Sequence, residues 1–276
     1  MKSSAKKVEL ASVDDLFTTE QERQEADEER VVRIPLTQLH YFKGYPAMQT
    51  EVPFTGQPYR FKDDDPKMQE TLDSVKKRGV RAPGLVRPDP DGGYEIISGH
   101  RRHRASELAG LEDMPVIIRD MTDEEAVIEM VDANIQREKV MPSEKAWAYR
   151  MKLEAIKHQG ARTDLTSVQV EQKLSARDKV AKDAGEKSGI QIMRYIRLTE
   201  LIPELLDMVD EKKIAFNPAY ELSFLKKEEQ IQLLDAMDSE QATPSLSQAQ
   251  RLKKFSQEGR LSIDVMRAIM GEEKKS

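Results

Sequence analysis

The chain has 276 residues, of which 38% are hydrophobic and 34% are charged, and its formal net charge is −6. It contains no cysteine, which excludes disulfides, thiolate metal sites and cysteine nucleophiles. No apolar run of about 18 residues occurs and the first residues lack the apolar core of a secretory signal, so we expect a cytoplasmic protein without a membrane span. The acidic total argues against indiscriminate coating of nucleic acid, although the local charge decides whether DNA is bound.

The N-terminal 30 residues carry nine acidic and five basic side chains and few apolar ones. We therefore expect residues 1–30 to be a flexible acidic leader. A short strand is predicted at Val31 to Pro35. Residues 40–62 hold several Pro, Gly and aromatic residues, which predicts a long loop of the kind that carries function.

The following segment has the pattern of a small α/β domain. Asp65 and Pro66 predict the N-cap and first position of a helix that ends near Gly79. A capping box opening at Thr122 predicts a second helix through Val131. Three segments are predicted strands, the first two as a hairpin: residues 84–87, 94–98 and 114–119.

A glycine and three arginines stand between the strand ending at Ser98 and a predicted short helix: Gly99, Arg101, Arg102 and Arg104. A helix N-terminus offers free backbone N–H groups and a partial positive charge, and neighbouring guanidinium groups add bidentate donors. This combination predicts a site for a polyanion, most naturally a phosphate chain. The alternative is a solvated, arginine-rich helix start whose side chains pair with nearby carboxylates.

From Pro142 onward the pattern is helical. Pro142 opens a helix that is expected to stop near Gly160. Two short predicted helices, residues 176–184 and 190–198, flank a glycine-containing turn, which is the helix-turn-helix pattern. Further helices are predicted up to the C-terminus.

The predicted helix-turn-helix lies in a basic part of an acidic protein, because residues 150–200 hold eleven Lys or Arg and seven Asp or Glu. Gln191 and Arg194 are expected to reach base edges, whereas Lys187 is expected to meet phosphates. The alternative is a solvated helix face with stray basic residues. The predicted DNA-binding residues are Lys187, Ser188, Gln191, Arg194, Tyr195 and Arg197.

Three segments resemble, in order, the ParB family of partition proteins. Gly99-His-Arg-Arg-His-Arg-Ala105 is similar to that family's GERRxRA box. Asn134-Ile-Gln-Arg-Glu138, followed by Pro142-Ser-Glu-Lys-Ala146, resembles its ENIQRE…PxEEA box. The helix-turn-helix then runs into Tyr195-Ile-Arg-Leu-Thr-Glu-Leu-Ile-Pro203, so the resemblance covers roughly residues 31–226.

The resemblance implies an α+β protein in which a small N-terminal α/β domain of ParB/sulfiredoxin-like fold precedes an all-helical helix-turn-helix domain. The implied boundaries are residues 31–132, 133–226 and a helical tail, 227–276. It also implies CTP and Mg²⁺ in the first domain, a palindromic centromere-like site on double-stranded DNA, a homodimeric sliding clamp and a ParA-type ATPase partner. The expected location is the nucleoid or a plasmid.

Carried over residue by residue, the resemblance implies a nucleotide site with Asn134 facing the Mg²⁺. His100 stands where the family has an acidic residue, and Ala133 stands where a carboxylate is expected. Asp132 is the candidate to replace that carboxylate, since a hard cation favours oxygen ligands. Nucleotide binding is therefore predicted, and slow CTP hydrolysis is left open. The implied nucleotide-binding residues are Gly99, His100, Arg101, Arg102, Arg104, Asn134, Gln136 and Arg137.

Four other functions are alternatives to a partition protein: sulfiredoxin, nuclease, transcription regulator and phosphotransferase. Sulfiredoxin activity needs a cysteine, which the chain lacks. A nuclease needs a carboxylate cluster for metal ions, and none is evident in the sequence outside the acidic leader. A sequence-specific transcription regulator with a vestigial nucleotide domain stays the main alternative, and a phosphotransferase is a more distant one.

Overall fold

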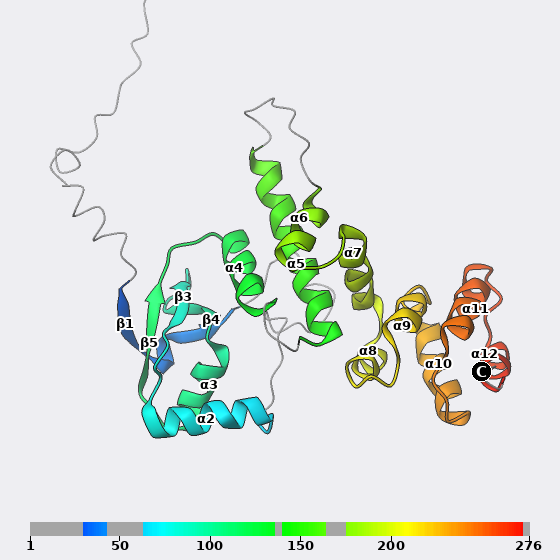
Figure 1. Ribbon diagram of the computed structural model, residues 1–276, viewed down its shortest axis with the longest axis horizontal. Helices are drawn as coiled ribbons and strands as arrows, with labels where there is room; N and C mark the ends of the chain where they lie inside the picture. The colour runs from blue at the N-terminus through cyan, green and yellow to red at the C-terminus, as the bar shows by residue number, and fades with distance from the viewer. Residues whose placement is uncertain (1–29, 43–62, 136–139, 164–174, 273–276) are drawn as a thin grey trace, which may run out of the picture.

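The computed structural model describes residues 30–42, 63–135, 140–163 and 175–272. An α/β unit lies at one end of an elongated molecule, α5 lies in the middle and the C-terminal helices lie at the other end (Figure 1). The predicted α+β class, with an α/β unit followed by helices only, is confirmed. Residues 1–29 of the predicted leader and residues 43–62 of the predicted loop lie outside the described residues.

The α/β unit is built on a five-stranded sheet with the order β1-β5-β3-β4-β2. The predicted hairpin is present, because β3 and β4 pair antiparallel. The sequence analysis did not predict β2, which lies at the sheet edge and pairs in parallel with β4. The strands are β1 (Val31–Pro35), β2 (Leu39–Tyr41), β3 (Gly84–Pro88), β4 (Tyr94–Ser98) and β5 (Asp113–Ile118).

Three helices complete this unit: α2 (Pro66–Arg78), α3 (His100–Leu108) and α4 (Asp123–Ile135). The Asp65 side chain caps α2 by accepting the Lys67 N–H at 3.0 Å, and the helix ends at Gly79, whose φ is +66°. At the start of α4, the Glu125 carboxylate accepts the Thr122 N–H at 2.9 Å. The caps predicted from the sequence therefore set the starts of both helices.

The helical part begins with α5 (Pro142–Thr163), which extends beyond the predicted end near Gly160. Met151 and Ala148 of α5 pack against Val127 and Met130 of α4, so the α/β unit and the helical part share an apolar interface. The remaining helices are α6 (Ala176–Asp183), α7 (Gly189–Arg197), α8 (Pro203–Asp210), α9 (Phe216–Leu222), α10 (Lys227–Ser239), α11 (Leu246–Gln257) and α12 (Ile263–Met270).

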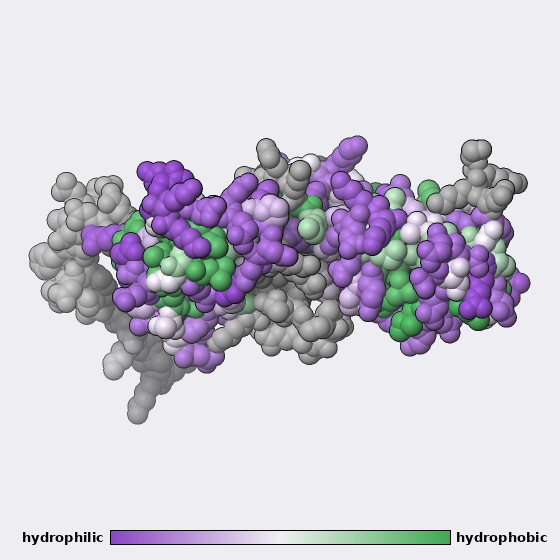
Figure 2. Space-filling view, turned by 90° about the horizontal axis from the view of Figure 1, so that it is seen from below, coloured by the Kyte–Doolittle hydropathy of each residue, from purple (hydrophilic) through white to green (hydrophobic). Residues whose placement is uncertain are grey.

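The C-terminal helices share one core with α8 and α9. Leu205 and Leu222 belong to the same buried cluster as Leu233, Leu252 and Met266. Residues 227–270 are thus packed onto the preceding helices and are not a separate tail in this structure. Figure 2 shows a largely hydrophilic face with apolar patches over the α/β unit and over the C-terminal helices. Within the described residues, no helix is both long enough and apolar enough to cross a membrane.

Candidate functional site

The turn from β4 into α3 depends on Gly99. Its φ of +108° and ψ of 14° lie in the left-handed region, which side chains other than glycine rarely adopt. A Cβ atom here would lie 3.1 Å from the Gly84 Cα and 3.3 Å from the Arg102 Nη2. The backbone at Gly99 therefore packs closely on the start of β3.

Two of the three arginines in this turn already have partners within the protein. Arg102 Nη1 donates to the carbonyls of Ala82 and Pro83, both at 2.6 Å, and burial lowers the pKa of its guanidinium. Arg104 pairs with Asp63 at 2.6 Å and with Glu107 at 3.1 Å. Those hydrogen-bonded carboxylates raise the pKa of Arg104. Arg102 thus holds the loop before β3. Arg104 forms the carboxylate pairs that are expected if this segment is a solvated, arginine-rich helix start and not a phosphate site.

Arg101 differs from its neighbours. It is partly exposed, and its buried Nε has no hydrogen-bond partner among the described residues. Nor do the described residues supply its guanidinium with an ion pair. Arg101 is therefore the arginine of this turn with unused donors at the N-terminus of α3.

The two histidines of the box pack against an aromatic ring. His100 is buried and stacks on Tyr41, with ring centroids 5.9 Å apart and an interplanar angle of 7°. His103 is also buried and meets the edge of the same ring at 5.6 Å. Burial lowers the pKa of His103, which favours its neutral form at neutral pH. Tyr41 belongs to β2, the strand that the sequence analysis missed.

The two predicted Mg²⁺ ligands already contact other groups of the protein. The Asp132 carboxylate pairs with Lys152 Nζ at 2.6 Å, and the same ammonium pairs with Asp183 at 2.9 Å. Asn134 is buried, and its Nδ2 donates to the Met130 carbonyl at 2.7 Å. Among the described residues, no group of three or more His, Cys, Asp or Glu could hold a metal ion. Two further predicted nucleotide contacts lie outside the described residues: Gln136 and Arg137.

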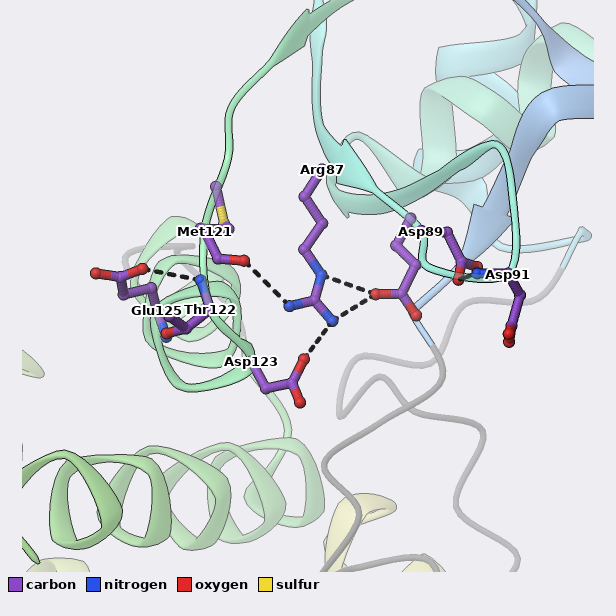
Figure 3. A network of polar contacts seen from close by, with 8 residues as sticks. Arg87, Asp89, Asp91, Met121, Thr122, Asp123 and Glu125 are labelled. Carbon is purple, nitrogen blue, oxygen red and sulfur yellow. Dashed lines mark hydrogen bonds and ion pairs between the residues drawn. The ribbon is translucent and has the colours of Figure 1, made fainter. Parts of the chain in front are cut away.

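An ion network that the sequence analysis did not anticipate ties the sheet to α4 (Figure 3). Arg87 of β3 pairs with Glu95 of β4 at 2.6 Å and with Asp123 of α4 at 2.7 Å. It also donates to the Met121 carbonyl at 3.4 Å and lies over the Phe42 ring at 5.4 Å. Burial lowers the pKa of Arg87, but the two carboxylates outweigh it and raise the pKa overall. A charged pair at Arg87 and Glu95, within two otherwise apolar strands, was the sequence signal for this network.

The two helices predicted as a helix-turn-helix are present as α6 and α7. Gly189 is required where they meet, because a Cβ atom there would lie 2.3 Å from the Asp178 Oδ1. Ser188 caps α7 by accepting the Gln191 N–H at 3.4 Å. Ile192 is fully buried and packs with Val180 of α6. The sequence thus predicted the two helices correctly.

The six predicted DNA-binding residues divide into two groups. Lys187 and Ser188 are exposed and Gln191 is partly exposed, all near the N-terminus of α7. The other three, nearer its C-terminus, are engaged by neighbouring helices: Arg194, Tyr195 and Arg197.

Helix α9 and the two residues that follow it hold the two arginines of the second group. Arg194 donates to Asn217 at 2.7 Å and lies 4.8 Å over the Tyr220 ring. Arg197 donates to the Ser223 carbonyl at 3.0 Å and lies 4.4 Å over the Phe224 ring. Tyr195 packs between Tyr149 and Phe216. These contacts hold the C-terminal part of α7 on its neighbours, and each of the three half-buried side chains has a partner within the protein.

The α6–α7 pair presents a basic surface because its acidic residues are paired internally. Asp178 accepts from the Ser175 hydroxyl and the Gly189 N–H, Asp183 pairs with Lys152, and Glu186 accepts from Lys145. Four basic side chains on α6 and in the turn are exposed and have no ion pair within the described residues: Arg177, Lys179, Lys182 and Lys187. The charge that faces solvent here is therefore positive.

Comparisons with known proteins agree with the boxes in the sequence. The profile of the ParB N-terminal domain matches residues 19–135. The chromosome-partitioning protein Spo0J of Thermus thermophilus is 31% identical over 201 residues, which are 73% of this chain and 62% of that one. The chain therefore spans less than two thirds of that relative.

Solved structures of ParB from Caulobacter crescentus also resemble the chain. The C-terminally truncated protein complexed to the centromeric parS site has a TM-score of 0.43 and 21% identity, covering 87% of this chain and 98% of that one. The same protein complexed with CTP-gamma-S has a TM-score of 0.33 and 23% identity, covering 70% and 92%. On the evidence of the profile match and the sequence relatives, the chain belongs to the ParB family, whose N-terminal domain it carries in residues 19–135.

Proposed function

We propose that this chain is a partition protein of the ParB type, which binds double-stranded DNA through α6–α7 and CTP at the start of α3. The observation that carries the proposal is the charge pattern of the helix pair. Four basic residues face solvent there while each acidic residue has an internal partner. A locally basic helix pair in an acidic protein suits a phosphate backbone.

On the nucleotide side, the three arginines have different roles in the proposal. Arg101 makes the principal phosphate contact, because its donors are unused within the described residues. Arg104 exchanges Asp63 for phosphate. The side chains of the Arg104–Asp63 pair are 36% and 50% exposed. Because solvent screens an exposed ion pair, it contributes little to stability, and phosphate can replace the carboxylate at little cost. Arg102 stays on its two carbonyls and shapes the turn.

The proposal is for nucleotide binding and includes no metal-dependent step. Asp132 shares the buried Lys152 ammonium with Asp183, and the Asn134 amide nitrogen donates within its own helix. Both predicted ligands thus have partners within the protein, and no step of the proposal is assigned to Mg²⁺ or to hydrolysis of CTP. His100, Gln136 and Arg137 stay predicted nucleotide contacts by resemblance alone.

On the DNA side, the exposed N-terminal part of α7 makes the contacts. Lys187 and Ser188 meet the backbone, and Gln191 reaches a base edge in the major groove. Arg194 and Arg197 position α7 by their hydrogen bonds to Asn217 of α9 and to the carbonyl of Ser223, which follows α9. A palindromic centromere-like site would be occupied by two copies of the chain. A ParA-type ATPase is the proposed partner, and the nucleoid or a plasmid is the proposed location.

One observation favours the alternative of a transcription regulator with a vestigial nucleotide domain. Two of the three box arginines, Arg102 and Arg104, already bind groups of the protein itself. A helix start that has lost its nucleotide would use its arginines in this way. The regulator and the partition protein share the DNA-binding helices and differ in whether CTP binds.

Equilibrium binding of labelled CTP to the full chain separates the two, with and without a duplex that the chain has selected from random sequences. A partition protein of the ParB type is expected to bind CTP, with an affinity that changes when the selected duplex is present. Selection of a duplex without any CTP binding would support the regulator instead. If neither ligand binds, both functions are excluded.

A further inference from the structure

The outer face of α7 carries two exposed apolar side chains. Ile190 is 67% exposed, the most of any large hydrophobic side chain in the described part of the chain, and Met193 is 43% exposed. The two are three residues apart and therefore neighbours on one face of the helix. Ile192, between them, points the other way into the core with α6.

The surroundings of this face indicate what covers it. Lys187 and Ser188 immediately precede the helix and are exposed, and Arg177, Lys179 and Lys182 are exposed on the adjoining helix α6. Two apolar side chains framed by basic residues suit a polyanion that also presents an apolar group. A second protein chain is a poorer fit, since a stable interface buries about 1,200 Å² or more and two side chains supply only a small part of that.

In the major groove of DNA, the apolar group is the C5 methyl of thymine, and contact with an apolar side chain is how proteins read it. The N-terminal part of a recognition helix is the part that meets base edges. Ile190 is the second residue of α7 and Met193 lies about one turn further on. We infer that Ile190 and Met193 are specificity-determining residues that read thymine methyl groups, so that the target site carries thymines where this face meets the groove.

This inference rests on the proposed DNA-binding function and names what its recognition helix selects. It also separates the residues of α7 by role. The exposed apolar pair and Gln191 read bases, the flanking lysine meets phosphate, and the two arginines hold the helix in place.

The test uses the full chain and duplexes that it enriches from a random-sequence pool. Each thymine of an enriched duplex is replaced in turn by deoxyuridine, which removes one methyl group and leaves base pairing unchanged. Burying a methyl contributes enough that its loss is expected to weaken binding about fourfold. We expect this loss at one or two positions of each half-site, measured by fluorescence anisotropy.

Variants assign the effect to the residues. In Ile190→Ala or Met193→Ala, the deoxyuridine effect is expected to vanish at the position that the missing side chain reads. Ile231→Ala is the matched control, because Ile231 is a 56% exposed isoleucine on α10, and this variant should keep every deoxyuridine effect. Circular dichroism checks that all three variants are folded, which we expect because the substituted side chains are exposed.

The outcomes are distinguishable. An enriched duplex with no deoxyuridine effect, or with effects that persist in both variants, overturns the inference and leaves the proposed function standing. If the chain enriches no sequence at all, the proposed function fails and the inference fails with it. A decrease in self-association of Ile190→Ala in sedimentation, without any deoxyuridine effect, would assign this face to a second copy and overturn the inference.

Discussion

Helices α3 and α7 have nine residues each and both carry arginines, yet their arginines are used in opposite ways. In α3 they follow the left-handed Gly99 and crowd the first turn, where Arg101 keeps its donors unused within the described residues. In α7 they lie in the last turn, where Tyr220 of α9 covers Arg194 and Phe224, just beyond α9, covers Arg197. The availability of an arginine to a ligand therefore follows from the element packed against it and not from its place in a motif.

The largest expected effect concerns the turn that makes α3 different. Gly99→Ala combines a positive φ with a Cβ atom 3.1 Å from the Gly84 Cα, so we expect it to lower the free energy of unfolding by about 3 kcal/mol. Gly110→Ala is the control, because Gly110 also has a positive φ but has no atom within 4 Å of its Cβ position. It should cost about 1 kcal/mol. Urea denaturation measures both, and equal losses would show that the close packing at Gly99 is unimportant.

The next effect separates the arginines within α3. Arg101→Ala is expected to weaken CTP binding by about 2–3 kcal/mol, the value of a hydrogen bond to a charged group, with little change in stability. Arg102→Ala should instead lower the free energy of unfolding, because it leaves the Ala82 and Pro83 carbonyls without their donor. Isothermal titration and urea denaturation of both variants give the comparison. Unchanged CTP binding by Arg101→Ala would remove the phosphate role from this helix.

In α7, Arg194 is expected to act on DNA binding by holding the helix in place. Arg194→Ala removes the hydrogen bond to Asn217 and the contact with Tyr220, which together contribute about 1–2 kcal/mol. We expect stability to fall and binding to random and selected DNA to weaken alike, and Tyr220→Leu should reproduce both effects. The sequence analysis placed Arg194 on a base edge. Loss of preference at a single base pair, in Arg194→Ala but not in Tyr220→Leu, would restore that role.

A smaller effect is expected at the exposed start of α7. Lys187→Ala should weaken binding to all duplexes by about 1 kcal/mol and reduce the slope of log K against log salt by about one. Lys227→Ala is a control outside this surface, since Lys227 donates to the Glu200 carbonyl at 2.6 Å. A salt slope that does not change in Lys187→Ala would mean that this lysine meets no phosphate.

The smallest expected effect is a pH dependence confined to α3. Burial lowers the pKa of His103 below its ordinary value near 6.5, so the unfolded chain binds the proton more readily than the folded one. Above a pH of about 6.5, protonation of His103 therefore takes nothing from the free energy of unfolding. As the pH falls through 6.5 towards the lower pKa of His103 in the folded protein, the free energy of unfolding decreases. In His103→Phe the decrease should be shallower. An identical pH profile for both proteins would show that His103 does not titrate in this range.

Much of the fold followed from local signals. The cap at Asp65, the capping box at Thr122 and the cap at Ser188 are short-range hydrogen bonds between residues two or three apart, so neighbouring residues alone specify them. Alternation marked the β3–β4 hairpin for the same reason. Strand β2 was missed because three residues carry too little alternation, and its partner β4 lies about fifty residues further along the chain.

The sequence located the candidate sites, and the tertiary structure showed which of their basic residues already have partners within the protein. Local sequence showed that Arg101, Arg102, Arg194 and Arg197 begin or end short helices, which is enough to suggest anion binding. Their partners come from elsewhere: Arg102 meets carbonyls about twenty residues earlier, and Arg194 meets Asn217, 23 residues later.

Whether a charged side chain is free depends on which distant element packs beside it, and helical periodicity contains no information about that. Lys152 shows the same limit, since only the packing of α4, α5 and α6 brings its ammonium between Asp132 and Asp183. The sequence alone therefore determined most of the elements, several of their caps and the family. The tertiary structure decided which basic residues stay available to a ligand, because burial and pairing are set by contacts between elements far apart in the chain.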